Sequence, residues 1–380
     1  MKVYFDSAAT TQLRDEVIDY MLTHMRSHFG NPSSTHFFGR DAKALIENTR
    51  KSIAKYTNTT GAEIIFTSCG TEANNLIIRS CVDYLGVERI ITSPLEHKCV
   101  AETVKTVEQN RKAEIQKLRV LPNGDLDLEQ LEELLKDESK KTLVSLMHAN
   151  NEIGNIYDIE KIGNLAHKYN ALYHTDMVQT LGHYPISLGD LPVDFASSSA
   201  HKYHGPKGVG FAFIRKGTGL KAQITGGGQE RNMRSGTENL IGIIGMGKAF
   251  ELANEEFEKD QKYILELKEY MIAQLKEAFP GIVFNGRSED SSKSLYAILS
   301  VLLPFKDSLI GFELDLKGIA VSQGSACSSG AAKVSDVIDS IVPAEVIEKT
   351  TPLRISFSHF NTKEEVDYFV EVLKEIGEKF

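Results

Sequence analysis

The stretch "EIIFTSCGTEANN" (63–75) joins two kinds of local structure at a single glycine. Its first half is a short β-branched run, which predicts a buried strand, and a helical pattern follows over residues 72–85. Backbone N–H groups at the start of that helix, near Thr71, can bind a phosphate, although Thr71 serving only as a helix cap would explain the same residues. A Walker loop is excluded because its G-K-[ST] ending is absent.

The alternation of strand and helix continues to about residue 215. Further β-branched runs occupy 89–93, 142–150, 171–176 and 209–214, and further helical patterns occupy 127–137 and 158–170. Strands that alternate with helices predict an α/β fold, in which a mostly parallel sheet has helices on both faces. Active sites of such sheets gather at the carboxyl ends of the strands, so polar residues at those ends are the candidates for chemistry.

The last third of the chain predicts a second, smaller α+β unit. A long helical stretch over 239–279 begins with an apolar segment that should be buried, and it leads into this unit. The runs "LYAILSVLLPF" (295–305) and "TPLRISFS" (351–358) indicate strands. Thr362 and Glu365 form a capping box in front of a final amphipathic helix.

The composition narrows the class of protein. The 380 residues carry a net charge of −9, which argues against broad nucleic-acid binding because such binding needs a basic face. The longest apolar stretch is too short to span a bilayer and the first residues carry no export signal, so we expect a cytoplasmic protein without a membrane anchor. The 4 cysteines include no C-x-x-C pair, which predicts reduced thiols and no metal site of the structural zinc type.

Two residues at predicted strand ends have the chemistry of a cofactor site. Lys202, in "SSAHKYHGPKG", can form a Schiff base with a carbonyl group when it is buried. Asp176, in "HTDMVQ", can keep a pyridinium nitrogen protonated, which is what pyridoxal phosphate needs to accept electrons. Either residue alone is more often a surface side chain in a polar loop, but the pair at two strand ends favours the cofactor interpretation.

Four further features can supply ligands to such a site. His97 can stack on a flat ring and move protons, or can cap a helix. The two asparagines in 147–155 need partners if buried, and the glycine-rich loop 226–239 can bind an anion or be a flexible surface loop. Arg354 can bind a carboxylate or form a structural ion pair. Cys327, in "SQGSACSSG" (322–330), can belong to a linker, bind a metal or act as a nucleophile.

Taken in order, these segments resemble the pyridoxal-phosphate-dependent cysteine desulfurases of the class-V aminotransferase group, in particular the subgroup that serves iron–sulfur cluster assembly and nitrogenase maturation. The matching segments are "YFDSAATT", "GNPSSTHFFGRDA", "TSCGTEANN", "EHK", "MHANNEIG", "HTDMVQTLG", "SSAHKYHGPKG", "GGGQERNMRSGTEN", "GSACSSG" and "LRISFS". The resemblance runs from about residue 4 to 375. It implies a fold-type I transferase with a mainly parallel seven-stranded sheet, a large domain over 13–260 and a small domain built from 1–12 and 261–380.

The resemblance also implies a role for each matching residue. Lys202 would form the Schiff base with pyridoxal phosphate, Asp176 would pair with the ring nitrogen, and His97 would stack on the ring. The other residues of the cofactor site would be Gly70, Thr71, Asn151, Gln179, Ser199, His201 and, from the second subunit of a homodimer, Thr237. The substrate carboxylate would be oriented by Asn31, Asn151 and Arg354.

The implied reaction converts L-cysteine to L-alanine and leaves the sulfur as a persulfide on Cys327, for delivery to a protein acceptor such as an iron–sulfur scaffold. Lys202 and His97 would move the protons, and a transient iron–sulfur cluster shared with the acceptor is a further role for Cys327. A selenocysteine lyase or cysteine-sulfinate desulfinase would share nearly all of this chemistry. An ordinary aminotransferase has no need for Cys327, and a non-catalytic scaffold has no need for Lys202. Gln323 stands where the family usually has a small residue.

Overall fold

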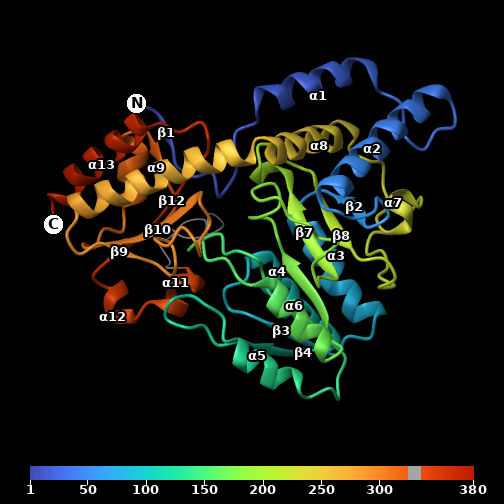
Figure 1. The fold of residues 1–380 in the computed structure, drawn as a ribbon, viewed down its shortest axis with the longest axis horizontal. Helices are drawn as coiled ribbons and strands as arrows, with labels where there is room; N and C mark the ends of the chain where they lie inside the picture. Colours follow the sequence, from blue (N-terminus) through green and yellow to red (C-terminus); the bar gives the residue numbers. More distant parts are fainter. Residues whose placement is uncertain (324–334) are drawn as a thin grey trace.

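The computed structural model describes residues 1–323 and 335–380, and a seven-stranded sheet forms the centre of the larger part of the molecule (Figure 1). Most of its strands are buried along their whole length, and three of them, Ile64–Thr67, Arg89–Thr92 and Thr142–Ser145, are rich in β-branched residues, as expected for a sheet covered on both faces. In spatial order they are β2 (Ile64–Thr67), β8 (Gly210–Ile214), β7 (Phe195–Ser199), β6 (Leu172–Asp176), β5 (Thr142–Ser145), β3 (Arg89–Thr92) and β4 (Glu114–Lys117).

The sheet is parallel except for β8, which runs antiparallel to its neighbours β2 and β7. This confirms the predicted α/β fold with a mainly parallel seven-stranded sheet. The sequence pattern did not indicate β4, because its run "EIQK" is polar and lies half-exposed at the edge of the sheet. The parallel strands all end at one edge, which brings together the segments that follow Thr67, Thr92, Ser145, Asp176 and Ser199.

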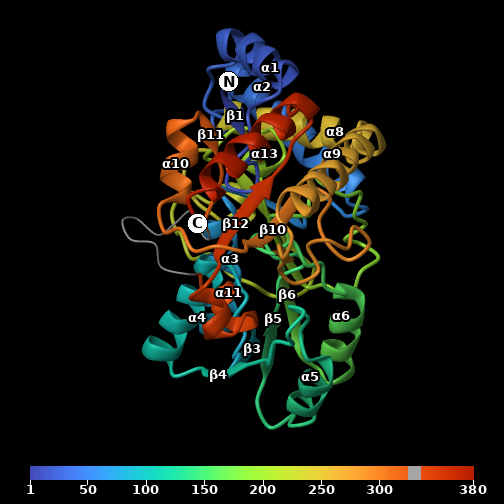
Figure 2. The same cartoon turned by 90° about the vertical axis from the view of Figure 1, so that its left-hand side faces the viewer.

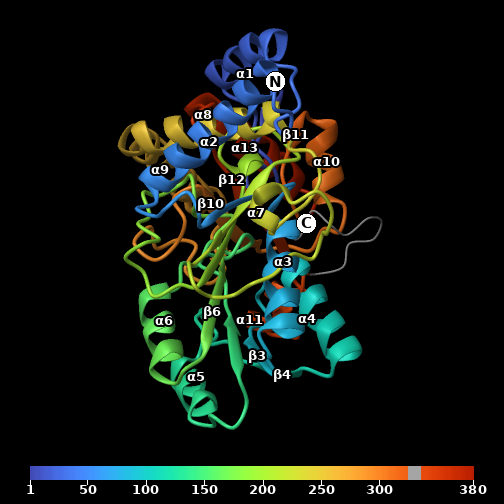
Figure 3. The ribbon, with the colours of Figure 1, turned by 90° about the vertical axis from the view of Figure 1, so that its right-hand side faces the viewer.

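Helices cover both faces of the sheet, and Figure 3 shows α3 and α4 on one side with α5 and α6 on the other. The helices predicted over 72–85, 127–137 and 158–170 are confirmed as α3 (Gly70–Tyr84), α5 (Leu128–Leu135) and α6 (Ile159–Lys168). The remaining helical segments of this part are α1 (Asp15–Ser27), α2 (Phe37–Tyr56), α4 (Lys98–Arg111), the short 3-10 helix Ala200–Lys202 and α7 (Gln229–Asn232).

Two helices occupy the stretch 239–279, where the sequence predicted one long helical region. α8 (Leu240–Glu255) and α9 (Phe257–Ala278) meet at Glu256, whose ψ of 8° departs from helical geometry. The carboxylate of Glu256 accepts a hydrogen bond from Arg14 Nη1 at 2.7 Å. α8 is buried on nearly all sides, as its apolar composition predicted, and the pair crosses from the larger to the smaller part of the molecule (Figure 1).

A second hydrophobic core forms the smaller part. In it, α9 and α13 (Lys363–Gly377) pack together beside an antiparallel sheet in the order β12 (Thr351–Ser356), β10 (Ile298–Leu303) and β9 (Val283–Phe284). The predicted strands near 295–305 and 351–358 are therefore confirmed, although each is shorter than its apolar run. Among the described residues, no helix combines the length and the apolar character needed to cross a membrane.

The N-terminal residues join this second core. β1 (Val3–Tyr4) pairs in parallel with β11 (Ile319–Ala320), and Figure 2 shows the pair between α10 (Ile310–Leu316) and α13. In the other direction, α11 (Asp336–Ile341) contributes two residues to the core of the larger part, and α12 (Ala344–Ile347) follows it. The two cores thus interlock, and the domain limits of 13–260 and of 1–12 with 261–380 stay a prediction.

The capping box of α13 gives a test of how much one helix end stabilises the second core. Thr362 Oγ1 accepts a hydrogen bond from Glu365 N at 3.3 Å, and Glu365 Oε2 accepts one from Thr362 N at 3.1 Å. We expect Thr362→Ala to lower the free energy of unfolding by about 1 kcal/mol because a backbone N–H loses its partner. Thr362→Ser keeps the hydroxyl and is the control. Melting temperatures of the three proteins check this, and equal values for the alanine and serine variants would contradict it.

Candidate active site

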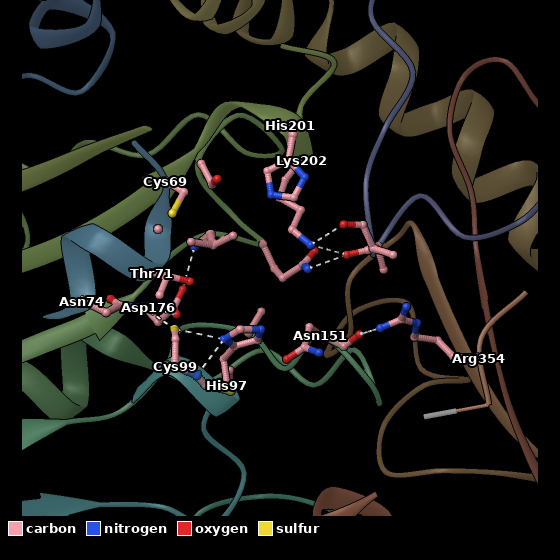
Figure 4. A pocket seen from close by; sticks show the side chains of 18 residues that line it. Cys69, Thr71, Asn74, His97, Cys99, Asn151, Asp176, His201, Lys202 and Arg354 are labelled. Carbon is pink, nitrogen blue, oxygen red and sulfur yellow. Dashed lines mark hydrogen bonds between the residues drawn. The ribbon is translucent and has the colours of Figure 1, made fainter. Parts of the chain in front are cut away.

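A cavity of about 230 Å³ lies at the carboxyl edge of the seven-stranded sheet. Figure 4 shows side chains from the ends of several strands pointing into it, with Arg354 from the smaller part on one side. Ala8 and Ala9 of the N-terminal segment close another part of its wall. The strand ends, a distant arginine and the first residues of the chain therefore meet at one place.

One end of the cavity is built for an anion. α3 begins there, and no side chain caps its first turn, so its backbone N–H groups face the cavity beside Thr71. Gly70 is needed at this point because a Cβ would lie 2.5 Å from Val178 Cγ2. Ser199 Oγ is buried without a protein partner, which leaves a hydroxyl ready to donate to a ligand.

His201 lies on the same side of the cavity. Its Nδ1 lies 3.2 Å from Thr10 Oγ1. Burial, with the charge of Lys202 as a second cause, lowers the pKa of His201 to about 4, so the ring is neutral near pH 7 in the protein alone. A neutral imidazole can still donate one N–H to an anion, and a bound anion would favour its protonation.

Asp176 is held in a fixed orientation beside the start of α3 (Figure 4). Asp176 Oδ2 accepts a hydrogen bond from Asn74 Nδ2 at 2.7 Å, and Oδ1 accepts one from Val178 N at 3.0 Å. The side chain of Gln179, from the same loop, donates to Ala8 O at 3.1 Å. The carboxylate is thus held by two donors while it lines the cavity.

His97 lines the cavity and also caps α4. Its Nδ1 accepts a hydrogen bond from Cys99 N at 3.2 Å, and Cys99 Sγ lies 3.0 Å from the same nitrogen. Burial is the main cause that lowers the pKa of His97, so the ring is neutral near pH 7. Because Nδ1 accepts, the single proton of the neutral ring lies on Nε2. Both interpretations of His97, as a cap and as a site residue, are therefore compatible.

Lys202 projects into the cavity from the turn after β7. Its Nζ donates to Ala8 O at 2.6 Å and to Ala9 O at 2.9 Å, as the dashed lines in Figure 4 show. These carbonyls belong to the N-terminal segment, which is far from Lys202 in the sequence. Tertiary contacts with a segment that is remote in the sequence therefore help to position the amino group.

Arg354 reaches the cavity from β12. Its Nη1 donates to Asn151 O at 2.9 Å and its Nη2 pairs with Asp6 Oδ1 at 2.8 Å, while its buried Nε has no partner among residues 1–323 and 335–380. The backbone of Arg354 also pairs with Ser322, which is one of the last described residues before the gap. Ser322, which precedes Cys327 by 5 positions in the sequence, therefore lies beside this arginine.

The structure brings together most of the residues that the sequence singled out. Those that line the cavity are Gly70, Thr71, His97, Asn151, Asp176, Gln179, Ser199, His201, Lys202 and Arg354. Asn31 and Thr237 are exposed and lie outside the cavity lining of this single chain, so their roles stay a prediction. Cys327 lies outside the described residues.

Sequence reasoning missed several residues of the site. Asn74 and Cys99 line the cavity, as does Cys69 at the start of α3. The signal for Asn74 was its position one helical turn after Gly70, which puts both residues on the same face of α3. Gln323, which had no assigned role, lies against α10: a Cβ on Gly311 would be 2.8 Å from its Oε1.

A buried carboxyl group supports the wall behind His97. Glu96 Oε1 accepts hydrogen bonds from Ser93 Oγ at 2.9 Å and from Met147 N at 3.0 Å. Its other oxygen has no partner, and burial raises the pKa of Glu96 to about 8. The group is therefore mostly protonated at neutral pH, and it ties the segment after β3 to the segment after β5.

This fold and this site define a class of protein. The chain matches the class-V aminotransferase family over residues 3–369, and it belongs to that family. The cysteine desulfurase IscS of Dictyoglomus turgidum is 42% identical, with 100% of this chain and 95% of the relative covered. The putative cysteine desulfurase IscS 1 of Bacillus subtilis is 38% identical over 96% of each chain.

Solved structures point to the same branch. A structure titled as a NifS-like protein has a TM-score of 0.91 and 38% identity, with both chains covered completely. The NifS-like protein of Rickettsia africae has a TM-score of 0.87 and 34% identity, again with full coverage of both chains. Within the class-V family, this chain therefore groups with the cysteine desulfurases.

The family implies pyridoxal phosphate, and the residues present fit that group. The first turn of α3, the unpartnered hydroxyl of Ser199 and the space kept open by Gly70 suit its phosphate. The fixed carboxylate of Asp176 suits a protonated ring nitrogen.

The raised pKa of Glu96 predicts a specific pH dependence of stability. The unfolded chain loses this proton near pH 4.5, whereas the folded protein keeps it up to about pH 8. The folded state therefore binds the extra proton between these values, and its stability falls as pH rises through them, by about 1 kcal/mol per pH unit. We expect Glu96→Gln to remove this contribution. Melting temperatures between pH 6 and pH 8 measure it.

The control for this experiment is Glu129→Gln, which changes an exposed carboxylate on the surface helix α5. Its melting temperature should follow that of the unchanged protein at every pH. Parallel curves for the unchanged protein and Glu96→Gln would show that Glu96 is ionised in the folded state.

Proposed function

We propose that the protein is a pyridoxal-phosphate-dependent cysteine desulfurase, which converts L-cysteine to L-alanine and leaves the sulfur on Cys327 as a persulfide. The observation that carries this proposal is the meeting of Lys202, Asp176 and Arg354 at one cavity that also has an anion-binding end. The family membership and the relatives named cysteine desulfurase support the same activity.

Lys202 would link the cofactor covalently, and the anion-binding end of the cavity would hold its phosphate. When bound, pyridoxal phosphate supplies an electron-accepting ring that makes the bonds at the substrate's α-carbon labile. Asp176 keeps the ring nitrogen protonated, and His97 lies where it can cover one face of the ring. Gln179 is within the same wall and can donate to the phenolic oxygen.

Arg354 and Asn151 would orient the substrate carboxylate. The guanidinium of Arg354 is buried and its Nε has no partner among the described residues, so an incoming carboxylate would meet a desolvated positive charge. Asp6 already balances part of that charge and fixes the plane of the guanidinium. The result is a cationic binding point at the end of the cavity that is remote from the phosphate.

Two side chains would move the protons. When Lys202 Nζ is not covalently linked, it can carry a proton to and from the α-carbon of the substrate. The carbonyl groups of Ala8 and Ala9 would keep the amino group in the cavity. His97 Nε2 bears the only proton of its neutral ring, so it can donate a proton as the carbon–sulfur bond breaks. Nδ1 cannot serve, because it already accepts a hydrogen bond from Cys99 N.

The sulfur step would use Cys327 as the nucleophile. Its thiolate attacks the sulfur of the substrate, a sulfur–sulfur bond forms, and the carbon–sulfur bond breaks with its electron pair left on the β-carbon. Protonation of that carbon completes L-alanine, so cysteine and enzyme thiol become alanine and enzyme persulfide without an external oxidant. The attachment of Ser322 to Arg354 supports this assignment, because the cysteine segment starts beside the substrate-binding residue.

Substitution of the two reactive residues tests the proposal. Cys327→Ala should abolish persulfide and alanine formation from L-cysteine but keep the visible absorbance of the bound cofactor. Lys202→Ala should remove the lysine-linked cofactor that borohydride reduction traps. Alanine, sulfide and persulfide assays with absorbance spectra measure these outcomes. Unchanged alanine production by Cys327→Ala, or a trapped lysine adduct in Lys202→Ala, would refute the corresponding role.

A homodimer would complete the site. α1 and the loop that follows it expose large apolar side chains, with Leu22 at 47%, Met25 at 55% and Phe29 at 73% exposure. A surface of this kind on a folded protein indicates a partner, and a second copy of the chain is the partner that the family implies. Thr237 and Asn31, exposed in the single chain, would then serve the cavity of the other subunit.

This dimer predicts that Leu22→Glu produces monomers, because a buried charge would be left unpaired in the interface. The matched control is Leu309→Glu, which places the same charge just before α10 at a residue that is 60% exposed. Size-exclusion chromatography with light scattering measures the molecular mass. The amount of bound cofactor reports the effect of losing the partner subunit's Thr237 from the cavity. A monomeric, fully active unchanged protein would contradict the dimer.

We further propose that the persulfide passes to a protein acceptor such as an iron–sulfur scaffold in the cytoplasm, with a transient cluster shared at Cys327 during transfer. The support is the chemistry of a persulfide, whose outer sulfur must be taken by a second thiol or metal–thiolate group. Relatives named IscS are consistent with such an acceptor.

A further inference from the structure

We propose that Asn74, His174 and Ser145 act together as positioning residues, forming a one-directional chain of hydrogen-bond donors that fixes the carboxylate of Asp176 against the cofactor ring. The proposal rests on the proposed function, in which Asp176 pairs with the ring nitrogen. It adds three residues that do not touch the cofactor to the set that controls it.

The chain is continuous and completely buried. Asn74 Nδ2 lies 2.7 Å from Asp176 Oδ2, His174 Nε2 lies 3.0 Å from Asn74 Oδ1, and Ser145 Oγ lies 2.9 Å from His174 Nδ1. Asn74, His174 and Ser145 each have 0% exposure. Figure 4 shows the first link, with Asn74 beside Asp176 at the wall of the cavity.

The fold explains why these residues meet. His174 precedes Asp176 by two positions on β6, so both side chains leave the sheet on the same face. Ser145 on β5 is the register partner of His174 across the two parallel strands. Asn74 comes from α3, which packs on that face of β6 and β7.

The chemistry of the groups sets the direction of every hydrogen bond. An ionised Asp176 can only accept, so the NH₂ group of Asn74 faces it and the carbonyl oxygen of Asn74 faces His174. His174 must then donate from Nε2. Burial lowers the pKa of His174 to about 4, so the ring carries a single proton, and Nδ1 must accept from the hydroxyl of Ser145.

Aligned donors of this kind strengthen one another in a buried site. Each hydrogen bond polarises the next one along the chain. The last bond, from Asn74, ends on the carboxylate of Asp176 and stabilises its negative charge. The bond to a charged acceptor is also the strongest link. Together with Val178 N on the other oxygen, the chain fixes the plane of the carboxylate before the cofactor arrives.

Two other titratable groups lie near this chain. Asn74 Nδ2 also approaches Cys99 Sγ at 3.3 Å, and burial raises the pKa of Cys99 to about 12, so the thiol stays neutral. Burial raises the pKa of Glu96 to about 8, so this carboxyl group is also mostly neutral near pH 7. Neither group supplies a charge that could replace the donors.

The test compares variants of the holoenzyme by the rate of cofactor release and by the visible absorbance of the bound cofactor. Asn74→Ala should release the cofactor at least about tenfold faster and shift its absorbance, because a charge-assisted hydrogen bond is lost. His174→Leu breaks the chain one link further out and should do the same to a smaller extent. His174→Gln keeps an amide donor in the chain and should restore most of the unchanged behaviour.

The matched control is Thr175→Val, which lies on the same strand between His174 and Asp176. Among the described residues its hydroxyl forms no hydrogen bond to Asn74, His174, Ser145 or Asp176, so the change keeps the shape and removes no link of this chain. A general loss of packing would affect Thr175→Val as well, whereas the chain predicts no change in its absorbance or release rate. If His174→Leu does not fold, Ser145→Ala decides, with an expected release about twofold to tenfold faster.

Asp176→Asn separates this proposal from the proposed function. If Asp176→Asn leaves absorbance and release unchanged, the assignment of Asp176 to the ring nitrogen is wrong. If Asp176→Asn changes both, but Asn74→Ala and His174→Leu behave like Thr175→Val, the assignment holds and the chain has no positioning role. Equal effects of His174→Gln and His174→Leu would also overturn the proposal.

Discussion

The parallel arrangement of the sheet is the constraint on which the rest of the molecule depends. Parallel strands all deliver the residues that follow them to one edge, so a cavity at that edge is lined by segments that are far apart in the sequence. Here the segments after β2, β3, β5, β6 and β7 supply its floor and most of its polar groups. β8, the single antiparallel strand, lies between β2 and β7. Because it runs in the opposite direction, its carboxyl end lies at the other edge of the sheet.

The N-terminal segment joins this edge to the second core. Ala8 accepts hydrogen bonds from both Lys202 and Gln179, and Asp6 pairs with Arg354. The same segment directly follows β1, and the pairing of β1 with β11 belongs to the smaller part of the molecule. Residues at the start of the chain therefore hold Lys202 and Arg354 in one arrangement, which neither core could set alone.

Buried polar groups account for much of the specificity of this arrangement. Unpartnered polar atoms are costly in a protein interior, yet Ser199 Oγ and Arg354 Nε have no partner in the part of the chain that the structure describes. Such atoms are explained when a ligand completes their hydrogen bonds. The polar groups further from the cavity, such as Asn74 and His174, have partners within the protein and give the wall its rigidity.

By itself, the sequence determined the α/β class, the identity of most cavity residues and the chemistry of Lys202, Asp176 and Arg354, because strand and helix periodicity and side-chain chemistry are local properties. It could not indicate β4, whose polar run has no apolar period, or the break at Glu256, where the helical pattern continues on both sides. Only the tertiary structure decided which partners the site residues have, since those contacts join residues that are remote in the chain. The hydrogen bond from Asn74 to Asp176 links a helix to a strand that lies 102 positions away. No periodicity encodes such a contact, because it exists only once the sheet and its helices have packed.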